Sequence, residues 1–376
     1  MKWPMTPISE FVTLLRNGKS IKQDPASGGL PITRIETIAD GTIDSSRLGY
    51  AGLEIADCKG WLLQEGDILV SHINSAKHLG KCAIFKGSPP DLVHGMNLLV
   101  LRADQNCACP RYIFHALRSQ SFRRGLPRIT KHSVNQSSFN ISSFKRLKIP
   151  LPPLPEQKRI AAILDAADEL RVKRRKSIEE LDTLLQATFL DMFGDPRVPG
   201  RPGKYETRTV PMGNLVRIRT GKLDANAADE NGRYPFFTCA SETLRINTEA
   251  YDTTAVLVAG NGDLNVKFYS GKFNAYQRTY IIESADQEHL HPLYLYVFLD
   301  LYVSELRKKA IGGVIKYIKK PYLTDAELPL PSLDLQLRFA TIVEKHNELT
   351  LSLRNHECSL NSLFESLQTR AFKREL

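Results

Sequence analysis

Several short motifs in the sequence resemble parts of nucleotide-binding or catalytic sites, and each of them is incomplete. Gly18-Lys19-Ser20 matches the end of a phosphate-binding loop, but Thr13 stands where the first glycine of that loop is needed. Gly260-Asn261-Gly262 opens a dinucleotide-binding pattern whose third glycine position holds Asn265. Ser88-Pro89-Pro90-Asp91 has the Pro-Pro pair of an amino-methyltransferase site, without the Asn or Asp before it or the aromatic residue after it. The sequence therefore predicts no catalytic constellation in this chain.

The spacing of cysteines and histidines predicts no metal site. Among six cysteines only Cys107 and Cys109 lie near each other, and a Cys-x-Cys pair without a second cluster has poor spacing for zinc. We interpret the cysteines as reduced thiols of a cytoplasmic protein. The N-terminal Met1-Lys2-Trp3-Pro4 lacks an apolar signal core, and no run of about 18 apolar residues occurs. We therefore expect neither secretion nor a membrane span.

The charge balance favours a polyanionic partner. The 376 residues include 51 Lys and Arg against 41 Asp and Glu, a formal net charge of +10. Nucleic acid is the commonest partner of such a surplus. A generally basic surface without such a partner is the alternative interpretation.

Polar and basic side chains of the types that contact bases and phosphates gather in both halves of the chain. In the first half, one cluster follows a predicted buried strand and comprises Ser71, His72, Asn74, Lys77, His78 and Lys81. A second cluster, predicted to contact phosphates, comprises Arg123, Arg124, Arg128, Lys131 and His132. In the second half, the predicted base-reading loops hold Asn261, Asp263, Asn265, Lys267, Gln277 and Arg278. The predicted phosphate-binding lysines there are Lys308, Lys309, Lys316, Lys319 and Lys320. For each residue the alternative is a solubilising lysine or a polar residue satisfying a turn.

The elements that must position these clusters recur in similar order in both halves. Runs of β-branched and apolar residues between turn residues predict strands at 32–38, 68–71, 82–85 and 97–101, followed by a helix at 112–119. The second half has predicted strands at 256–259, 267–269 and 279–282, followed by a helix at 293–306. A turn-rich linker at 194–203 separates the halves.

A long internal repeat connects the two halves. Ile149-Pro-Leu-Pro-Pro-Leu-Pro-Glu-Gln-Lys-Arg-Ile-Ala-Ala-Ile-Leu returns in degraded form as Leu328-Pro-Leu-Pro-Ser-Leu-Asp-Leu-Gln-Leu-Arg-Phe-Ala-Thr-Ile-Val, an offset of 179 residues (328 minus 149). Each copy opens a long helical pattern. We conclude that the chain was built twice from one unit, with a common connecting segment and variable regions before it.

The two predicted helices carry heptad stripes. Steps of three and four residues predict a coiled-coil seam, and its two halves are expected to pair antiparallel within the chain, with polar midpoints near Arg174. Packing of the stripes on the globular regions or on a partner chain is the alternative. A helix over 156–193 would be roughly 57 Å long. The predicted seam residues are Ile160, Ile163, Leu170, Arg174, Leu181, Leu184, Phe339, Ile342, Leu349, Leu353, Leu360 and Leu363.

The repeated segment, together with the closing Leu363-Phe-Glu-Ser-Leu-Gln-Thr-Arg-Ala-Phe-Lys-Arg-Glu-Leu376, resembles the specificity subunit of type I restriction–modification enzymes over the whole chain. The second copy departs from the family pattern at Ser332 and Leu335. The resemblance implies an α+β fold with a pseudo-two-fold repeat: two mixed α/β target-recognition domains joined by two long antiparallel helices that form an intramolecular coiled coil. The implied boundaries are a first target-recognition domain at 1–148 and a spacer helix at 149–194, then a linker and second domain at 195–327 and a second spacer helix at 328–376.

The resemblance also implies partners and a role in host defence by DNA methylation and restriction. Each domain would read one half of a split DNA site, and the helices would recruit two methyltransferase subunits and the ATP-driven restriction subunits. S-adenosylmethionine, ATP and magnesium would then be bound by those partners and not by this chain. The other interpretations are a two-headed DNA-binding regulator or specificity module of another methyltransferase system, a self-sufficient nuclease or methyltransferase, and a scaffold that does not bind DNA.

Overall fold

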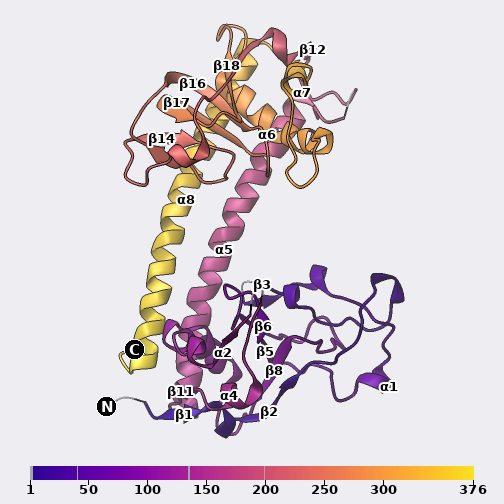
Figure 1. Ribbon diagram of the computed structural model, residues 1–376, viewed down its shortest axis with the longest axis vertical. Coiled ribbons are helices and arrows are strands. Elements are labelled where there is room, and N and C mark those ends of the chain that lie inside the picture. The colour runs from indigo at the N-terminus through magenta and orange to yellow at the C-terminus, as the bar shows by residue number, and fades with distance from the viewer. Residues whose placement is uncertain (1–2, 40, 134–135, 199) are drawn as a thin grey trace. The chain divides into compact units, whose positions relative to one another are not determined.

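The computed structural model describes residues 3–39, 41–133, 136–198 and 200–376, and its chain divides into two compact units. Unit 1 comprises residues 1–173 and 357–376, and unit 2 comprises residues 174–356. Two long helices, α5 (Leu154–Phe193) and α8 (Leu333–Lys373), each contribute one half to each unit. Figure 1 shows these helices with the elements of each unit around them.

Unit 1 is built on a four-stranded antiparallel sheet with the order β2-β8-β5-β7. These strands are β2 (Val12–Asn17), β5 (Ile68–Ser71), β7 (Cys82–Ile84) and β8 (Leu98–Ala103). The residues of β5 and β7 are all buried, which accounts for their continuous apolar sequence. One face of the sheet packs against the amphipathic helix α2 (Pro110–Arg118) and the first half of α5, forming the main core of the unit.

Smaller elements complete unit 1. Strand β1 (Met5–Pro7) pairs antiparallel with β11 (Lys148–Pro150), and β3 (Ile38–Ala39) pairs with β4 (Thr42–Ile43). A three-stranded sheet has the order β6-β10-β9, formed by β6 (Ile73–Asn74), β10 (Ser137–Ser138) and β9 (Lys131–His132). The short helices are α1 (Ile55–Cys58), α3 (Gln120–Arg123) and α4 (Ile141–Lys145).

Unit 2 repeats this framework, with β16 and β17 much longer than β5 and β7. Its six-stranded sheet has the order β13-β18-β16-β17-β14-β15, and β12 (Arg208–Pro211) pairs with β19 (Glu327–Leu330). The sheet strands are β13 (Val216–Thr220), β14 (Tyr234–Phe237), β15 (Leu244–Ile246), β16 (Tyr251–Ala259), β17 (Val266–Ala275) and β18 (Thr279–Ser284). Helices α6 (Pro292–Lys309) and α7 (Lys320–Thr324) follow, and α6 packs on the sheet and on α5 and α8.

The two units share a common strand order. Strands β2-β8-β5-β7 correspond to β13-β18-β16-β17, and the β1–β11 pair corresponds to β12–β19. Among the residues that the structure describes, only those of unit 2 extend the sheet, with β14 and β15. The predicted duplication of a mixed α/β unit is therefore confirmed.

Helices α5 and α8 pack against each other antiparallel in each unit. In unit 1, Arg171 Nε donates to Asn361 Oδ1 at 2.7 Å, and Arg159 Nη2 donates to the Leu376 carbonyl at 3.1 Å. In unit 2, Phe189 stacks edge-on against Phe339, with 5.5 Å between the ring centroids. Residues later in α5 therefore contact residues earlier in the C-terminal segment that contains α8, so the two helices run antiparallel. This confirms the predicted intramolecular pairing.

The buried stripe on the two helices follows the predicted seam at every second position only. At the positions between, the residue one place further along the chain is the buried one. Ile160 and Phe339 are buried as predicted, whereas Leu170, Leu184, Ile342, Leu349 and Leu363 are exposed. The neighbouring positions carry the contact instead, as Leu164, Ile178, Val343, Thr350 and Phe364 show. The phase was ambiguous because apolar residues stand side by side, as in Leu363-Phe364, and the larger aromatic ring takes the buried position.

Several element boundaries differ from the predicted ones. The predicted strands at 256–259 and 267–269 are parts of the longer strands β16 and β17. The predicted strand at 32–38 is wrong: residues 35–37 form a 3-10 turn (η3, Ile35–Thr37), and Ile32 makes only isolated bridges to Gly49 and Val93. Helix α5 begins at Leu154, before Pro155, because the proline ring is compatible with the first helical turn. None of the described helices is apolar over a long enough stretch to cross a membrane.

Candidate nucleic-acid interface

A buried glutamine joins each long helix to the globular part of its unit. In unit 1, Gln157 Nε2 donates to the carbonyls of Cys107 (2.9 Å) and Pro152 (2.8 Å), and its Oε1 accepts from the Cys109 amide at 2.8 Å. The side chain is fully buried, so these bonds satisfy all but one of its hydrogen-bonding groups without help from solvent. The segment that precedes α2 is thereby held against the start of α5.

The same arrangement recurs in unit 2. Gln336, 179 residues further along, donates to the carbonyls of His289 (3.0 Å) and Pro331 (3.1 Å) and accepts from the His291 amide at 2.8 Å. A buried tyrosine accompanies each glutamine: the hydroxyl of Tyr112 donates to the Pro150 carbonyl, and that of Tyr294 donates to the Pro329 carbonyl. The junction between the long helix and the globular part therefore has the same set of hydrogen bonds in both units.

The β6-β10-β9 sheet brings together Asn74 from the first predicted cluster of unit 1 and Lys131 and His132 from the second. Ser137 on the central strand faces Asn74 on one side and His132 on the other, and Lys131 lies opposite Ser138. The His132 ring Nδ1 lies 2.9 Å from the Ser137 hydroxyl. Polar and basic side chains from loops about sixty residues apart (132 minus 74) are thus placed on one surface.

Two of the predicted base readers in this unit are buried. Ser71 is inaccessible to solvent, and His72 is 5% exposed and packs edge-on against Phe139. Burial lowers the pKa of His72 to about 4, so the ring is neutral at physiological pH and supplies no positive charge. These residues support the loop, whereas Asn74, Lys77 and His78 reach its surface. This corrects the prediction for Ser71 and His72.

Two hollows flank this surface in unit 1. One, of about 370 Å³, is lined by Ile35, Glu36, Ile38, Arg47, Ser71, Asn74, His78 and Lys81. The other, of about 300 Å³, includes Lys81, Arg118, Arg123 and Arg171 in its lining, together with the acidic Glu365. Arg118 and Arg171 both pair with Asp168, at 2.9 and 2.8 Å. Lys81 and Arg123 make no side-chain ion pair within the described residues, so their charges remain available to an anion.

In unit 2 the backbone gathers three of the predicted segments side by side. The Gly260 amide donates to the Arg278 carbonyl at 2.8 Å, and the Gly262 amide donates to the Lys316 carbonyl at 2.8 Å. Asn261 therefore lies between the Gln277-Arg278 turn and the lysine-rich segment. The side chains of Gln277 and Arg278 are exposed and make no hydrogen bond or ion pair within the described residues.

Asn265 and Lys267, also predicted as base readers, are engaged inside unit 2. Lys267 Nζ donates to Asn265 Oδ1 and to the Ala240 carbonyl, both at 2.6 Å, and Asn265 Nδ2 donates to the Cys239 carbonyl at 2.9 Å. Burial lowers the pKa of Lys267. Asp263 pairs with Arg307 at 3.2 Å. These contacts fix the loop and engage three of its predicted base readers inside the unit, unlike Gln277 and Arg278.

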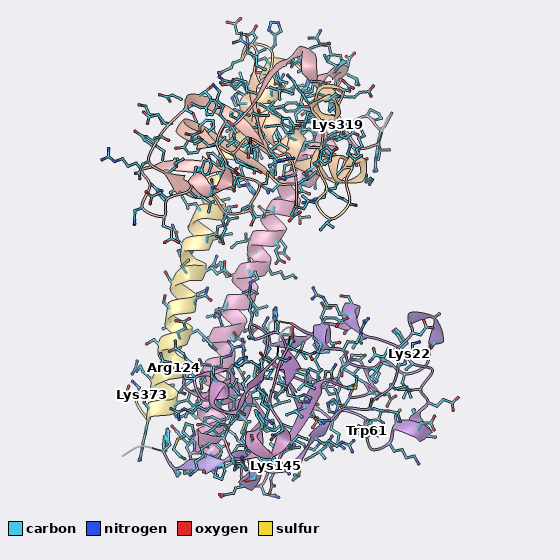
Figure 2. All side chains as sticks on the ribbon, viewed as in Figure 1. Lys22, Trp61, Arg124, Lys145, Lys319 and Lys373 are labelled. Atoms are coloured by element: carbon cyan, nitrogen blue, oxygen red, sulfur yellow. The ribbon has the colours of Figure 1, made fainter. Side chains whose placement is uncertain are left out.

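The predicted lysines of unit 2 are all exposed, and they differ in their contacts. Lys308 pairs with Glu305 at 2.7 Å, Lys309 donates to the Tyr302 hydroxyl at 2.8 Å, and Lys320 donates to the Ile218 carbonyl at 3.3 Å. Lys316 and Lys319 make no side-chain contact of this kind within the described residues. Figure 2 marks Lys319 among the exposed side chains of this unit.

The incomplete phosphate-loop motif has a structural role. Gly18 follows β2, and a Cβ there would lie 1.8 Å from the Gly95 carbonyl oxygen. Gly221 follows β13 in unit 2, and a Cβ there would lie 2.1 Å from the Ala275 carbonyl oxygen. Glycine is therefore needed for the close approach of two chain segments. Among the described residues, no group of three or more His, Cys, Asp or Glu is placed to hold a metal ion.

Comparison with known proteins agrees with this architecture. The family model "Type I restriction modification DNA specificity domain" matches twice, over residues 1–181 and 204–359. A Methanocaldococcus jannaschii protein named as the specificity subunit of the type I restriction enzyme MjaX is 32% identical, covering 92% of this chain and 87% of its own. The specificity subunit of the Escherichia coli enzyme EcoDI is 42% identical over 161 residues, 43% of this chain and 35% of its own.

A solved structure supports the same fold. The crystal structure of the S subunit of a type I restriction–modification system from M. genitalium aligns with a TM-score of 0.56 over 98% of this chain and 96% of its own, at 17% identity. The two matches of the family model, each over a globular part and much of the long helix that follows it, fit the duplicated framework. The chain belongs to the DNA specificity subunits of type I restriction–modification systems, the non-catalytic subunits that give these enzymes their DNA sequence specificity.

Proposed function

We propose that this chain reads a bipartite DNA site, with one half-site read by the globular part of each unit. The observation that carries this proposal is the pairing of a shared framework with dissimilar polar surfaces. The Gln157 and Gln336 junctions have the same hydrogen bonds, while the surfaces around Asn74 and Asn261 differ in sequence and in strand support. A duplicated scaffold that carries two different polar surfaces suits a DNA site made of two different half-sites.

The proposed DNA contacts are the exposed and half-buried members of the clusters described above, apart from Asp263, Asn265 and Lys267, which are engaged inside unit 2. In unit 1 they are Asn74, Lys77, His78, Lys81, Arg123, Arg124, Arg128, Lys131 and His132. In unit 2 they are Asn261, Gln277, Arg278, Lys308, Lys309, Lys316, Lys319 and Lys320. Amides and arginines at loop ends have the donors and acceptors that read base edges, and lysines suit phosphates. The net charge of +10 supports a polyanionic partner.

We further propose that α5 and α8 carry the contacts with two methyltransferase subunits and with the restriction subunits. Exposed apolar side chains on these helices support this, since Leu170, Leu184 and Leu351 are 53%, 60% and 63% exposed. S-adenosylmethionine, ATP and magnesium would be bound by those partners. Such a complex would work in the cytoplasm, where it meets DNA.

Copurification and DNA binding test the proposal together. The chain should copurify with a methyltransferase encoded beside it, and the complex should bind its duplex site with an affinity that falls steeply with salt. Binding by the chain without any methyltransferase partner would favour a two-headed DNA-binding regulator. Stable assembly without DNA binding at low salt would contradict the proposal.

A further inference from the structure

The segment between α6 and α7 in unit 2 forms a loop with an apolar tip. Ile311 and Tyr317 pair across its base, with amide-to-carbonyl distances of 3.0 and 2.8 Å. Val314 and Ile315 occupy the tip, and their side chains are 104% and 62% exposed. Val314 is the most exposed of the large hydrophobic side chains that the structure describes. Exposing two adjacent apolar side chains to water is unfavourable, which points to a partner that covers them.

The surroundings of this tip are basic. Lys316 follows Ile315 directly, and Lys319 lies just beyond the base of the loop, both exposed and without a side-chain hydrogen bond or ion pair within the described residues. Lysine is depleted at interfaces between proteins but is a common phosphate ligand. The combination of an apolar tip and unpaired lysines therefore favours a nucleic acid over a protein as the covering partner.

The tip is also tied to a proposed base-reading loop. Tyr317 forms an antiparallel bridge with Asn261, and the Ile318 amide donates to the Gly260 carbonyl at 2.9 Å. The Tyr280 hydroxyl donates to the Ile318 carbonyl at 3.1 Å, which anchors the base of the loop to the main sheet. A duplex whose bases are contacted by Asn261 would therefore meet the apolar tip at the same time.

We propose that Val314 and Ile315 act as a wedge that enters a groove of the DNA and unstacks one base-pair step of the half-site read by unit 2. Apolar side chains inserted between base pairs open the step and bend the duplex, while nearby lysines hold the phosphates. Because some steps unstack more easily than others, the wedge would add sequence preference at a position that no polar side chain contacts. This inference rests on the proposed reading of DNA by unit 2.

The test uses the complex of the full chain with its methyltransferase and a duplex carrying its methylated site, with 2-aminopurine placed at successive positions. The fluorescence of 2-aminopurine rises when the base loses its stacking neighbours. With the native chain we expect a rise at one step of the unit 2 half-site, apart from the adenine that the methyltransferase itself flips out of the stack. In a V314A/I315A variant the rise should disappear and the affinity should fall about tenfold, since apolar burial is lost. The salt dependence of binding should be unchanged.

Two control variants separate the roles. Lys316→Ala should keep the fluorescence rise and reduce the dependence of affinity on salt. Val198→Ala, which shortens a 46% exposed apolar side chain in the loop after α5, should change neither quantity. An unchanged fluorescence rise in V314A/I315A would overturn the wedge. The wedge would also be overturned if V314A/I315A bound DNA normally but lost the methyltransferase from the complex. That result would show that the tip contacts a protein. Failure of the native complex to bind any duplex would instead overturn the proposed function.

Discussion

The Nε2 atom of His115 on α2 lies 2.8 Å from Oδ1 of Asp165 on α5, and the Arg111 guanidinium pairs with the other oxygen of the same carboxylate. His115 is almost fully buried, so this pair ties the globular part of unit 1 to the long helix from within. Burial alone would raise the pKa of Asp165, but hydrogen bonds from His115 and Arg111 outweigh it and hold the pKa at about 2.

This carboxylate should make the stability of unit 1 sensitive to acid. Its pKa is lower in the folded state than its ordinary value of 3.8, so the stabilisation is present above about pH 4 and is lost as pH falls toward 2. Asp165→Asn should remove up to about 2 kcal/mol of stability at neutral pH and flatten the decline between pH 4 and 2. Denaturant unfolding at several pH values measures both effects. The exposed Asp57, changed to Asn, is the matched control, and equal pH profiles for the two variants would contradict the prediction.

The glutamine junctions should matter equally in the two units. Gln157→Ala leaves two carbonyls and one amide without partners in a buried site, and Gln336→Ala does the same in unit 2. Each substitution should cost about 2–4 kcal/mol. Hydrogen exchange should show faster exchange of the amides of Cys109 and His291, respectively. Gln186→Ala, at an exposed position of α5, should leave exchange at both sites unaltered.

The basic residues without ion pairs should contribute to DNA affinity through phosphates. Lys77→Ala and Lys131→Ala in unit 1 should each weaken binding by similar factors for every DNA sequence. Each should also reduce the slope of log affinity against log salt by about 1. Lys173→Ala, on α5, provides a control of equal charge change. A change in sequence preference with an intact salt slope would show that these lysines contact bases.

The duplicated scaffold could be predicted from the sequence because the patterns that indicate it are local. Pro-rich strands, helix starts and apolar periodicity are properties of neighbouring residues, and the 179-residue offset makes their repetition visible. The junction could not be predicted, although Gln157 and Gln336 occupy equivalent positions in the repeat. Apart from the nearby carbonyls of Pro152 and Pro331, their hydrogen-bond partners lie about 45–50 residues earlier in the chain, and only the folded units bring them together.

The sequence predicts the proposed DNA-contacting surfaces as clusters but not as individual side chains. The sequence has polar residues directly after the predicted buried strands, where loops expose side chains to a ligand. It could not separate Asn265 and Lys267, which bond to each other, from the exposed Gln277 and Arg278. Likewise, Ser71 and His72 are as polar as Asn74, and only packing against Phe139 shows that His72 faces the core.

Methylated positions across a genome test the division of labour between the two units most directly. Cells that express the chain with its methyltransferase should show one motif, made of two specific half-sites separated by unspecified bases. A Q277A/R278A variant should change the bases required in one half-site and leave the other half-site and the spacing intact. Arg208→Ala, an exposed arginine on β12, should leave the motif unchanged. Three results would contradict the assignment of one half-site to each unit. The native motif could be continuous, Q277A/R278A could leave the motif unaltered, or that variant could alter both half-sites.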